Sequence, residues 1–263
     1  MNLWNRVWLL AWLVGWIGLA HAQTVQKTVD IPTRAGVTQR FLLLTPVAPK
    51  AAVILMAGGN GGLQIDSNGS MRWGGNNFLV RTRQMFADQG FLVAVVDAPS
   101  DRQGGPFLSG FRQTPEHVED IKSVIAWIRT QSGLPVWLVG TSRGTQSAAF
   151  VGIALSGAGG PDGLVLTSSI LVDPKGRSVN AMRLSELHIP VLVVHHEQDG
   201  CKLCPFQETG TLMEQLTNAP RKELLSIKGG DSFGDPCESR AHHGFNGLDS
   251  EVVAQMTAWM LRN

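Results

Sequence analysis

The stretch Val136-Trp137-Leu138-Val139-Gly140-Thr141-Ser142-Arg143-Gly144-Thr145 decides how this chain folds. Its first half is a short apolar run of the kind that forms a strand buried on both faces, and the small residues that follow are typical of a closely packed helix. Glycines two positions before and after Ser142 let strand and helix approach each other, and the sharp turn between them strains the serine backbone. We therefore expect the Ser142 hydroxyl to stand above the end of a sheet.

The same Gly-x-Ser-x-Gly spacing occurs a second time, at Gly230-Asp231-Ser232-Phe233-Gly234. Asp235-Pro236 follows it, and a proline at this point opposes a helix that begins at the serine. The context therefore favours Ser142 as the nucleophile and predicts a loop around Ser232. A trypsin-like interpretation of this second stretch would need an all-β double barrel, which the helical periods elsewhere in the chain contradict.

Strands and helices alternate along the rest of the chain. Alternating polar and apolar residues predict an antiparallel pair at a sheet edge, at 24–31 and 39–45. Continuous apolar runs predict buried parallel strands at 52–57, 91–97, 136–140, 164–168, 191–195 and 223–227. Helical periodicity is found at 78–89, 115–132, 145–156, 205–217 and 250–261. This order predicts an α/β fold with one doubly wound, mostly parallel sheet flanked by helices.

Only a short segment connects the predicted strands at 164–168 and 191–195. It has no room for a large lid domain, so we expect an open site. The two glycine-rich loops 60–77 and 100–114 are expected to supply its walls. Possible apolar contacts to a ligand in these loops are Met71, Trp73, Phe107, Leu108 and Phe111. The alternative for each of these side chains is packing within its own loop.

Residues 1–22 have the pattern of a secretory signal peptide. Arg6 precedes an apolar core at 7–20, and Ala20-His21-Ala22 is a small-x-small cleavage site. The apolar run is shorter than the ~20 residues that a bilayer span needs, which favours cleavage over an uncleaved anchor. The sequence therefore predicts a single domain over 23–263, periplasmic or secreted, with no stable membrane span after removal of the signal.

The charges of the chain are balanced. It has 22 lysines and arginines and 21 aspartates and glutamates, and Arg6 is the one charged residue of the predicted signal. A net charge near zero argues against a nucleic acid or an anionic membrane surface as a partner.

Three cysteines, Cys201, Cys204 and Cys237, permit one disulfide and one remaining thiol in an oxidising compartment. We expect a Cys201–Cys237 bond, with Cys204–Cys237 as the alternative. Cys201 and Cys204 have the C-x-x-C spacing, but they do not open a helix after a first strand, so a redox role is not expected. The adjacent histidine pairs 195–196 and 242–243 lack the spacing of zinc ligands, so no metal is expected.

Polar residues follow the ends of three predicted strands, in the order serine, aspartate, histidine. Ser142 follows the strand at 136–140, Asp199 follows the strand at 191–195, and His242-His243 comes after the strand at 223–227. Functional groups of a doubly wound sheet gather outside the carboxyl ends of its strands. A serine hydroxyl becomes a good nucleophile when an imidazole takes its proton and a carboxylate orients that imidazole. These side chains are therefore expected to meet.

In this order of residues the chain resembles the α/β-hydrolases, and most closely the small dienelactone-hydrolase-like serine esterases. The resemblance extends over nearly all of 23–263. It is carried by Gly-Thr-Ser-Arg-Gly at 140–144, His-His-Glu-Gln-Asp at 195–199 and His-Gly-Phe at 243–245. The chain departs from the family pattern at Ala57-Gly58, where a histidine precedes the glycine in the family.

The resemblance implies a catalytic triad of Ser142, Asp199 and His243. It places the catalytic histidine directly before a glycine, which favours His243 over His242. Position after the late strand favours Asp199 over the alternative acids Asp173 and Glu197. A Cys201–Cys237 bond would tie the loops of the acid and the base together.

Acyl transfer also needs two backbone amides that bind the oxyanion of the transition state. One is expected from Arg143 and the other from Gly59 or Asn60 within the stretch Gly58-Gly59-Asn60-Gly61-Gly62. This stretch has neither the lysine-serine of a P-loop nor the spacing of a dinucleotide site. Its alternative interpretation is a flexible turn.

The expected function is therefore that of an exported serine hydrolase. It would cleave carboxylic ester bonds of a small-molecule or polymer substrate through an acyl-enzyme, and this chemistry requires no cofactor. Two alternatives remain open from the sequence: an acyltransferase that uses the same triad, and a catalytically silent binding protein with a hydrolase-like fold.

Overall fold

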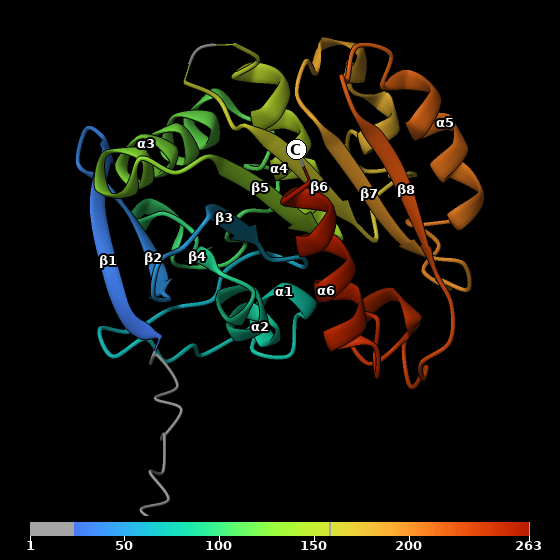
Figure 1. The fold of residues 1–263 in the computed structure, drawn as a ribbon, viewed down its shortest axis with the longest axis horizontal. Coiled ribbons are helices and arrows are strands. Elements are labelled where there is room, and N and C mark those ends of the chain that lie inside the picture. Colours follow the sequence, from blue (N-terminus) through green and yellow to red (C-terminus); the bar gives the residue numbers. More distant parts are fainter. Residues whose placement is uncertain (1–23, 158, 263) are drawn as a thin grey trace, which may run out of the picture.

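The computed structural model describes residues 24–157 and 159–262, in which eight strands form one sheet (Figure 1). The strand order is β1-β2-β4-β3-β5-β6-β7-β8. β1 and β2 are antiparallel, β2 and β4 are antiparallel, and all pairs from β4 to β8 are parallel. The strands are β1 Val25–Arg34, β2 Val37–Thr45, β3 Ala51–Met56, β4 Phe91–Val96, β5 Val136–Thr141, β6 Gly163–Thr167, β7 Val191–His196 and β8 Lys222–Ile227.

Helices cover both faces of the sheet. They are α1 Phe78–Arg81, α2 Arg83–Asp88, α3 Pro115–Ser132, α4 Arg143–Ala154, α5 Thr209–Gln215 and α6 Asp249–Met260. Apolar side chains of α3, α4 and α5 form one core with the sheet, and those of α1, α2 and α6 form the other (Figure 1). The predicted fold class, a doubly wound and mostly parallel sheet, is confirmed.

The central strands could be recognised in the sequence because both of their faces are covered. Every residue of β3, β4, β5 and β7 is buried. Such strands are continuous apolar runs rather than alternating ones. The predicted boundaries of these four strands consequently agree with the observed ones to within one residue.

Two predicted helices have different limits in the structure. The segment 78–89 is two short helices, α1 and α2, which meet at Thr82, where the backbone angles of φ −92° and ψ 0° depart from helical values. The segment 205–217 is a short turn of 3₁₀-helix, Phe206–Glu208, followed by α5. That helix ends before Leu216, whose backbone angles are no longer helical.

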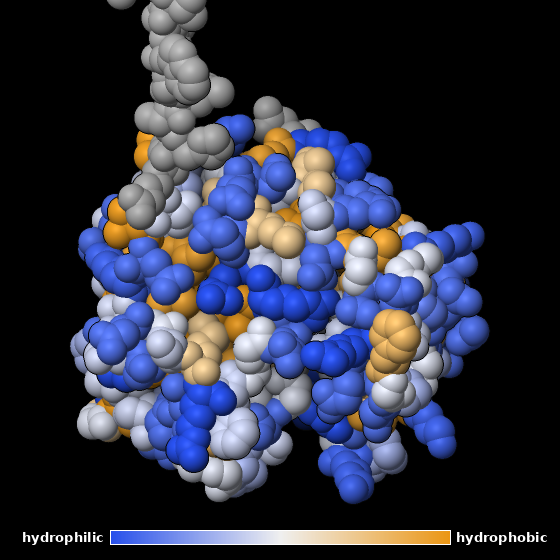
Figure 2. All heavy atoms as spheres, turned by 90° about the horizontal axis from the view of Figure 1, so that it is seen from below, coloured by the Kyte–Doolittle hydropathy of each residue, from blue (hydrophilic) through white to orange (hydrophobic). Residues whose placement is uncertain are grey.

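The connection between β6 and β7 contains only two 3₁₀ turns, Val179–Ala181 and Leu184–Glu186, and is not a lid domain. In the view from below, hydrophobic side chains form separate patches within a largely hydrophilic surface (Figure 2). Across residues 24–157 and 159–262, no helix has both the length and the apolar character needed to cross a bilayer. The predicted signal at 1–22 lies outside the described residues.

Candidate active site

Ser142 lies in a strained turn between β5 and α4. Its φ of 52° and ψ of −126° are unusual for a residue with a side chain. A Cβ at Gly140 would collide with the backbone of Gly144, and a Cβ at Gly144 would collide with the carbonyl oxygen of Met56. Glycine is therefore required on both sides of the serine, which is the physical reason for the spacing seen in the sequence.

Asp199 and His243 form a close, buried pair. Nδ1 of His243 lies 2.9 Å from Oδ2 of Asp199, and both side chains are almost fully buried. Asp199 follows β7, and His243 lies in the 3₁₀ turn His242–Gly244 between β8 and α6. The structure thus brings together the acid and the base expected from the sequence.

Two histidines lower the pKa of Asp199. Burial by itself would raise it, but hydrogen bonds from His195 and His243 outweigh burial and hold the pKa at about 2. The Cys201 amide adds a third hydrogen bond, to Oδ1 at 2.9 Å. Asp199 is therefore a carboxylate at neutral pH and can only accept a hydrogen bond, which in the neutral ring of His243 puts the hydrogen on Nδ1 and leaves a lone pair on Nε2.

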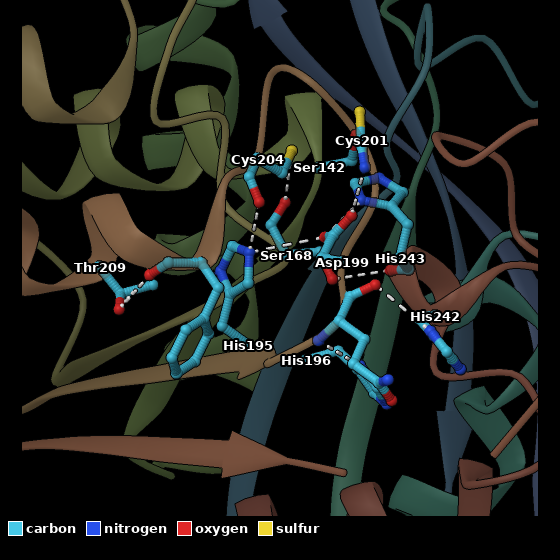
Figure 3. A network of polar contacts seen from close by, with 12 residues as sticks. Ser142, Ser168, His195, His196, Asp199, Cys201, Cys204, Thr209, His242 and His243 are labelled. Atoms are coloured by element: carbon cyan, nitrogen blue, oxygen red, sulfur yellow. Dashed lines mark hydrogen bonds and ion pairs between the residues drawn. The ribbon is translucent and has the colours of Figure 1, made fainter. Parts of the chain in front are cut away.

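Further polar contacts support this pair from the protein interior (Figure 3). The hydroxyl of Ser168 donates to the carbonyl of His243 at 2.7 Å. His195 Nε2 lies 2.9 Å from the Cys204 carbonyl and 3.5 Å from Oδ2 of Asp199. Because the Cys204 carbonyl can only accept, Nε2 of His195 carries a hydrogen that also faces the carboxylate. His195 had no assigned role in the sequence, and here it orients the acid.

The alternative base, His242, belongs to a different contact. Its ring stacks on His196 with centroids 4.2 Å apart, and its Nδ1 lies 3.3 Å from the carbonyl of Gln198 (Figure 3). His196 in turn lies 2.8 Å from the Gly229 carbonyl through Nε2. Unlike His243, His242 is not paired with Asp199.

The alternative acids have other partners. Asp173 forms an ion pair with the Arg143 guanidinium at 2.9 Å and accepts from the Gln146 side chain at 3.1 Å. Burial acts to raise its pKa, but these contacts keep the pKa below its usual value. Glu197 forms an exposed ion pair with Lys228 at 3.2 Å. Ser232 is exposed in the loop after β8.

Ser142 and His243 line the same cavity, whose volume is about 1180 Å³. The loop after β3 and the loop after β4 supply much of its wall, including Met71, Trp73 and Phe107. Leu108 and Phe111 instead pack against Ala98 in a small core beneath the loops. Nε2 of His243 is buried and has no hydrogen-bond partner among the described residues. The imidazole therefore has an unused basic nitrogen at the cavity that also contains the serine.

The amides expected to bind an oxyanion also lie at this cavity. Gly59, Asn60 and Arg143 all line it, and Gly59 has a φ of 58°. The amides of Gly59, Asn60 and Arg143 donate no hydrogen bond within the parts of the chain that the structure describes. Asn60 uses its carbonyl to accept from Leu108 at 2.9 Å and its side chain to accept from Gly62 at 3.1 Å.

Two buried charges that sequence reasoning missed hold this glycine-rich loop. Arg112 donates to the carbonyls of Ala57 and Gly59, both at 3.1 Å. Burial and the charge of Arg143 lower the pKa of Arg112 to about 9, so its guanidinium stays protonated at neutral pH. Asp97, at the end of β4, accepts from the amides of residues 63, 64 and 65 at 2.7–3.2 Å. The position of Asp97 directly after an apolar run was the only signal for its role, and no local pattern pointed to Arg112.

The predicted disulfide between Cys201 and Cys237 is present, and Cys204 is a buried free thiol. The bond joins the loop of Asp199 to the loop that leads to His243. Possible metal-ligand atoms of Cys201, Cys204 and His243 lie within 4.8 Å of one another, a cluster not apparent from the sequence. Because the sulfur of Cys201 is bonded to Cys237, it does not offer a thiolate to a metal.

Solved structures of esterases and related hydrolases have the same arrangement of strands and helices. A dienelactone hydrolase from Anabaena variabilis superposes with a TM-score of 0.63 at 12% identity, over 91% of this chain and 98% of that one. An esterase from Pyrococcus furiosus superposes with a TM-score of 0.63 at 14% identity, over 90% of this chain and 92% of that one. A cold-adapted esterase from an Arctic intertidal metagenomic library has a TM-score of 0.59 at 15% identity, over 93% of this chain and 98% of that one.

At sequence level there is no comparable match. No protein-family model and no curated protein matches the chain. The similarity to the solved structures extends over about nine-tenths of the chain. The chain therefore has the α/β-hydrolase fold.

Proposed function

We propose that this protein is an exported serine hydrolase that cleaves carboxylic ester bonds, with Ser142 as nucleophile, His243 as base and Asp199 as orienting acid. The observation that carries the proposal is the 2.9 Å contact between His243 Nδ1 and Asp199 Oδ2. It leaves the buried Nε2 without a partner at the cavity that Ser142 also lines. The three residue types and this polarity of the imidazole are those of a catalytic triad.

In the first half of the reaction, Ser142 Oγ attacks the ester carbonyl carbon while His243 Nε2 takes the hydroxyl proton. The carbonyl oxygen acquires the negative charge, and the free amides of Arg143 and of Gly59 or Asn60 are available to bind it. When the tetrahedral intermediate collapses, the carbon–oxygen bond to the alcohol breaks. Nε2 returns its proton to the departing alcohol, and the acyl group remains on the serine.

In the second half, a water molecule gives its proton to Nε2 and its oxygen attacks the acyl carbon. Collapse of the second intermediate releases the carboxylic acid, and Ser142 recovers its proton. Asp199 stabilises the imidazolium formed in each half, because its low pKa keeps it ionised. The residues required for this cycle are all part of the chain.

Export is supported by two features. The pattern at 1–22 is that of a secretory signal, and the Cys201–Cys237 bond is suited to an oxidising compartment. We infer a periplasmic or secreted protein.

Labelling with a fluorophosphonate probe tests the catalytic assignment. We expect the probe to label the wild-type protein and not Ser142→Ala. Ser232→Ala is the matched control, since it removes the other serine with the same glycine spacing, and it should be labelled normally. Absence of labelling in the wild type would instead favour a silent binding protein.

Hydrolysis of aryl esters of graded acyl length measures the substrate range. Released acid and released alcohol should appear in equal amounts with water as the acceptor. Addition of a primary alcohol separates hydrolysis from acyl transfer, since formation of a new ester in place of acid would identify an acyltransferase.

A further inference from the structure

The side chain of Asn77 makes no hydrogen bond within the described residues, although it lies beside the proposed nucleophile. Asn77 precedes α1, a position where asparagine commonly accepts a hydrogen bond from a helix amide, but it makes no such bond here. Its Oδ1 is buried and unpartnered. This oxygen is an acceptor and cannot itself bind a negative oxygen; the donor of the amide is Nδ2, which also has no hydrogen-bond partner among the described residues and can donate to a group in the cavity.

Gly58 relates the position of this amide to Ser142. A Cβ placed on Gly58 would lie 2.9 Å from Cβ of Ser142 and 3.3 Å from Nδ2 of Asn77. The two side chains thus flank the same backbone position, and only glycine leaves room for both. Asn77 and Ser142 both line the large cavity, together with Gly59 and Arg143. Nδ2 is therefore next to the region that a carbonyl group attacked by Ser142 has to occupy.

The main chain of Asn77 accounts for its structural role without the side chain. Its amide donates to the Gly74 carbonyl at 2.9 Å, and its carbonyl accepts from the Arg81 amide at 2.9 Å. Both bonds persist when the side chain is replaced. The turn before α1 thus does not depend on the asparagine amide group.

We propose that Nδ2 of Asn77 is a third donor of the oxyanion hole, which binds the ester carbonyl oxygen together with the amides of Arg143 and of Gly59 or Asn60. This inference rests on the proposed function and identifies a further catalytic residue for it. A side-chain amide presents an N–H donor at no charge, so it stabilises the oxygen most when that oxygen becomes negative. Its effect is therefore expected on turnover rather than on substrate binding.

Two variants test this role. In Asn77→Ala, kcat for an aryl ester is expected to fall about 100-fold while KM changes by less than about threefold, because the lost bond is specific to the transition state. The near-isosteric Asn77→Asp replaces the donor with an acceptor that repels the oxyanion, so its kcat should fall further than that of Asn77→Ala. Affinity for an alkyl boronic acid, which mimics the tetrahedral intermediate, should decrease in parallel with kcat.

The matched control is Asn68→Ala, which removes the same amide group from an exposed side chain of the same loop that does not line the cavity. Its kcat should stay within about threefold of wild type. Melting temperatures of all variants report folding, and if Asn77→Ala unfolds, Asn77→Asp decides the question because it keeps the shape of the side chain.

The outcomes separate this inference from the proposed function. If fluorophosphonate labelling depends on Ser142 but the folded Asn77 variants keep their kcat, the oxyanion role is wrong and the serine hydrolase proposal stands. A rise in KM alone would likewise overturn it, since that result indicates ground-state binding. If the wild type neither labels nor hydrolyses esters, both are wrong.

Discussion

Arg81 on α1 donates from Nη2 to the main-chain carbonyl of Gly244 at 2.6 Å, directly after the proposed base, His243. The same guanidinium forms an ion pair with Asp249 at 2.7 Å, at the start of α6. A helix that follows the glycine-rich loop thereby holds the turn that carries the imidazole. The position of His243 thus depends on contacts from both sides: Asp199 and Ser168 on one, Arg81 on the other.

Replacement of Arg81 is expected to impair turnover through the position of His243. In Arg81→Met, kcat should fall roughly 10- to 100-fold, because a displacement of the base by about 1 Å costs that much. Arg83→Met is the control, since among the described residues the side chain of Arg83 donates only to the nearby Val80 carbonyl, at 2.6 Å. Steady-state kinetics with one aryl ester measures both, and equal losses in the two variants would argue against a specific role of Arg81.

The two adjacent histidines are expected to differ sharply in their effect on activity. His243→Ala removes the group paired with Asp199, and kcat should fall by about four orders of magnitude or more with folding intact. His242→Ala removes a ring that stacks on His196 and should retain most of the activity. Turnover, together with circular dichroism as a check of folding, separates them. A large loss in His242→Ala and a small one in His243→Ala would reverse the assignment.

Asp199 is expected to make stability depend on pH in the acid range. Its pKa is about 2 in the folded protein, below the ordinary value of 3.8. A depressed pKa contributes stability that is present above about pH 4 and is lost as the pH falls through about 2, which amounts to roughly 2 kcal/mol for this shift.

Urea unfolding at several pH values between 5 and 2 measures this contribution. Asp199→Asn should lack it, so the difference in stability between wild type and variant is expected to shrink as the pH falls. The same variant should lose about 10⁴-fold in kcat, because an amide no longer selects the required tautomer of His243. An unchanged stability difference across this range would show that the carboxylate is not held in its charged form.

The disulfide is expected to stabilise the protein through the loop that it closes. Cys201 and Cys237 are 36 positions apart, and a closed loop of this length corresponds to about 4 kcal/mol in the chain-entropy model. The double variant Cys201→Ser/Cys237→Ser should be destabilised by about that amount. Dithiothreitol should lower the melting temperature of the wild type and not that of the double variant.

Cys204→Ser is the control for this measurement. Its thiol donates to the Ser168 carbonyl at 3.4 Å, a bond that a serine hydroxyl can replace, and the variant leaves the disulfide intact. It should therefore remain sensitive to dithiothreitol. Equal stability of the wild type before and after reduction would show that the disulfide does not stabilise the loops of the acid and the base.

The strands and the elbow were predictable because their signals are local. β3, β4, β5 and β7 are buried on both faces, so each is a continuous apolar run. Gly140 and Gly144 are needed within two residues of Ser142 because the strand and helix that they join nearly touch. The break at Thr82 was missed, since a local change of backbone angles at one residue does not alter the apolar period of the segment.

The sequence by itself indicated that the serine, the aspartate and the histidine pair lie at one edge of the sheet. The reason is that the carboxyl ends of parallel strands share an edge whatever the conformation of the loops. Only the tertiary structure decided which of the two adjacent histidines is paired with Asp199. It also decided that Asp173 forms an ion pair with Arg143. It also placed Asn77 and Arg112 at the glycine-rich loop. These choices depend on side-chain directions in irregular loops and on contacts between residues far apart in the chain, and no local pattern of the sequence encodes either.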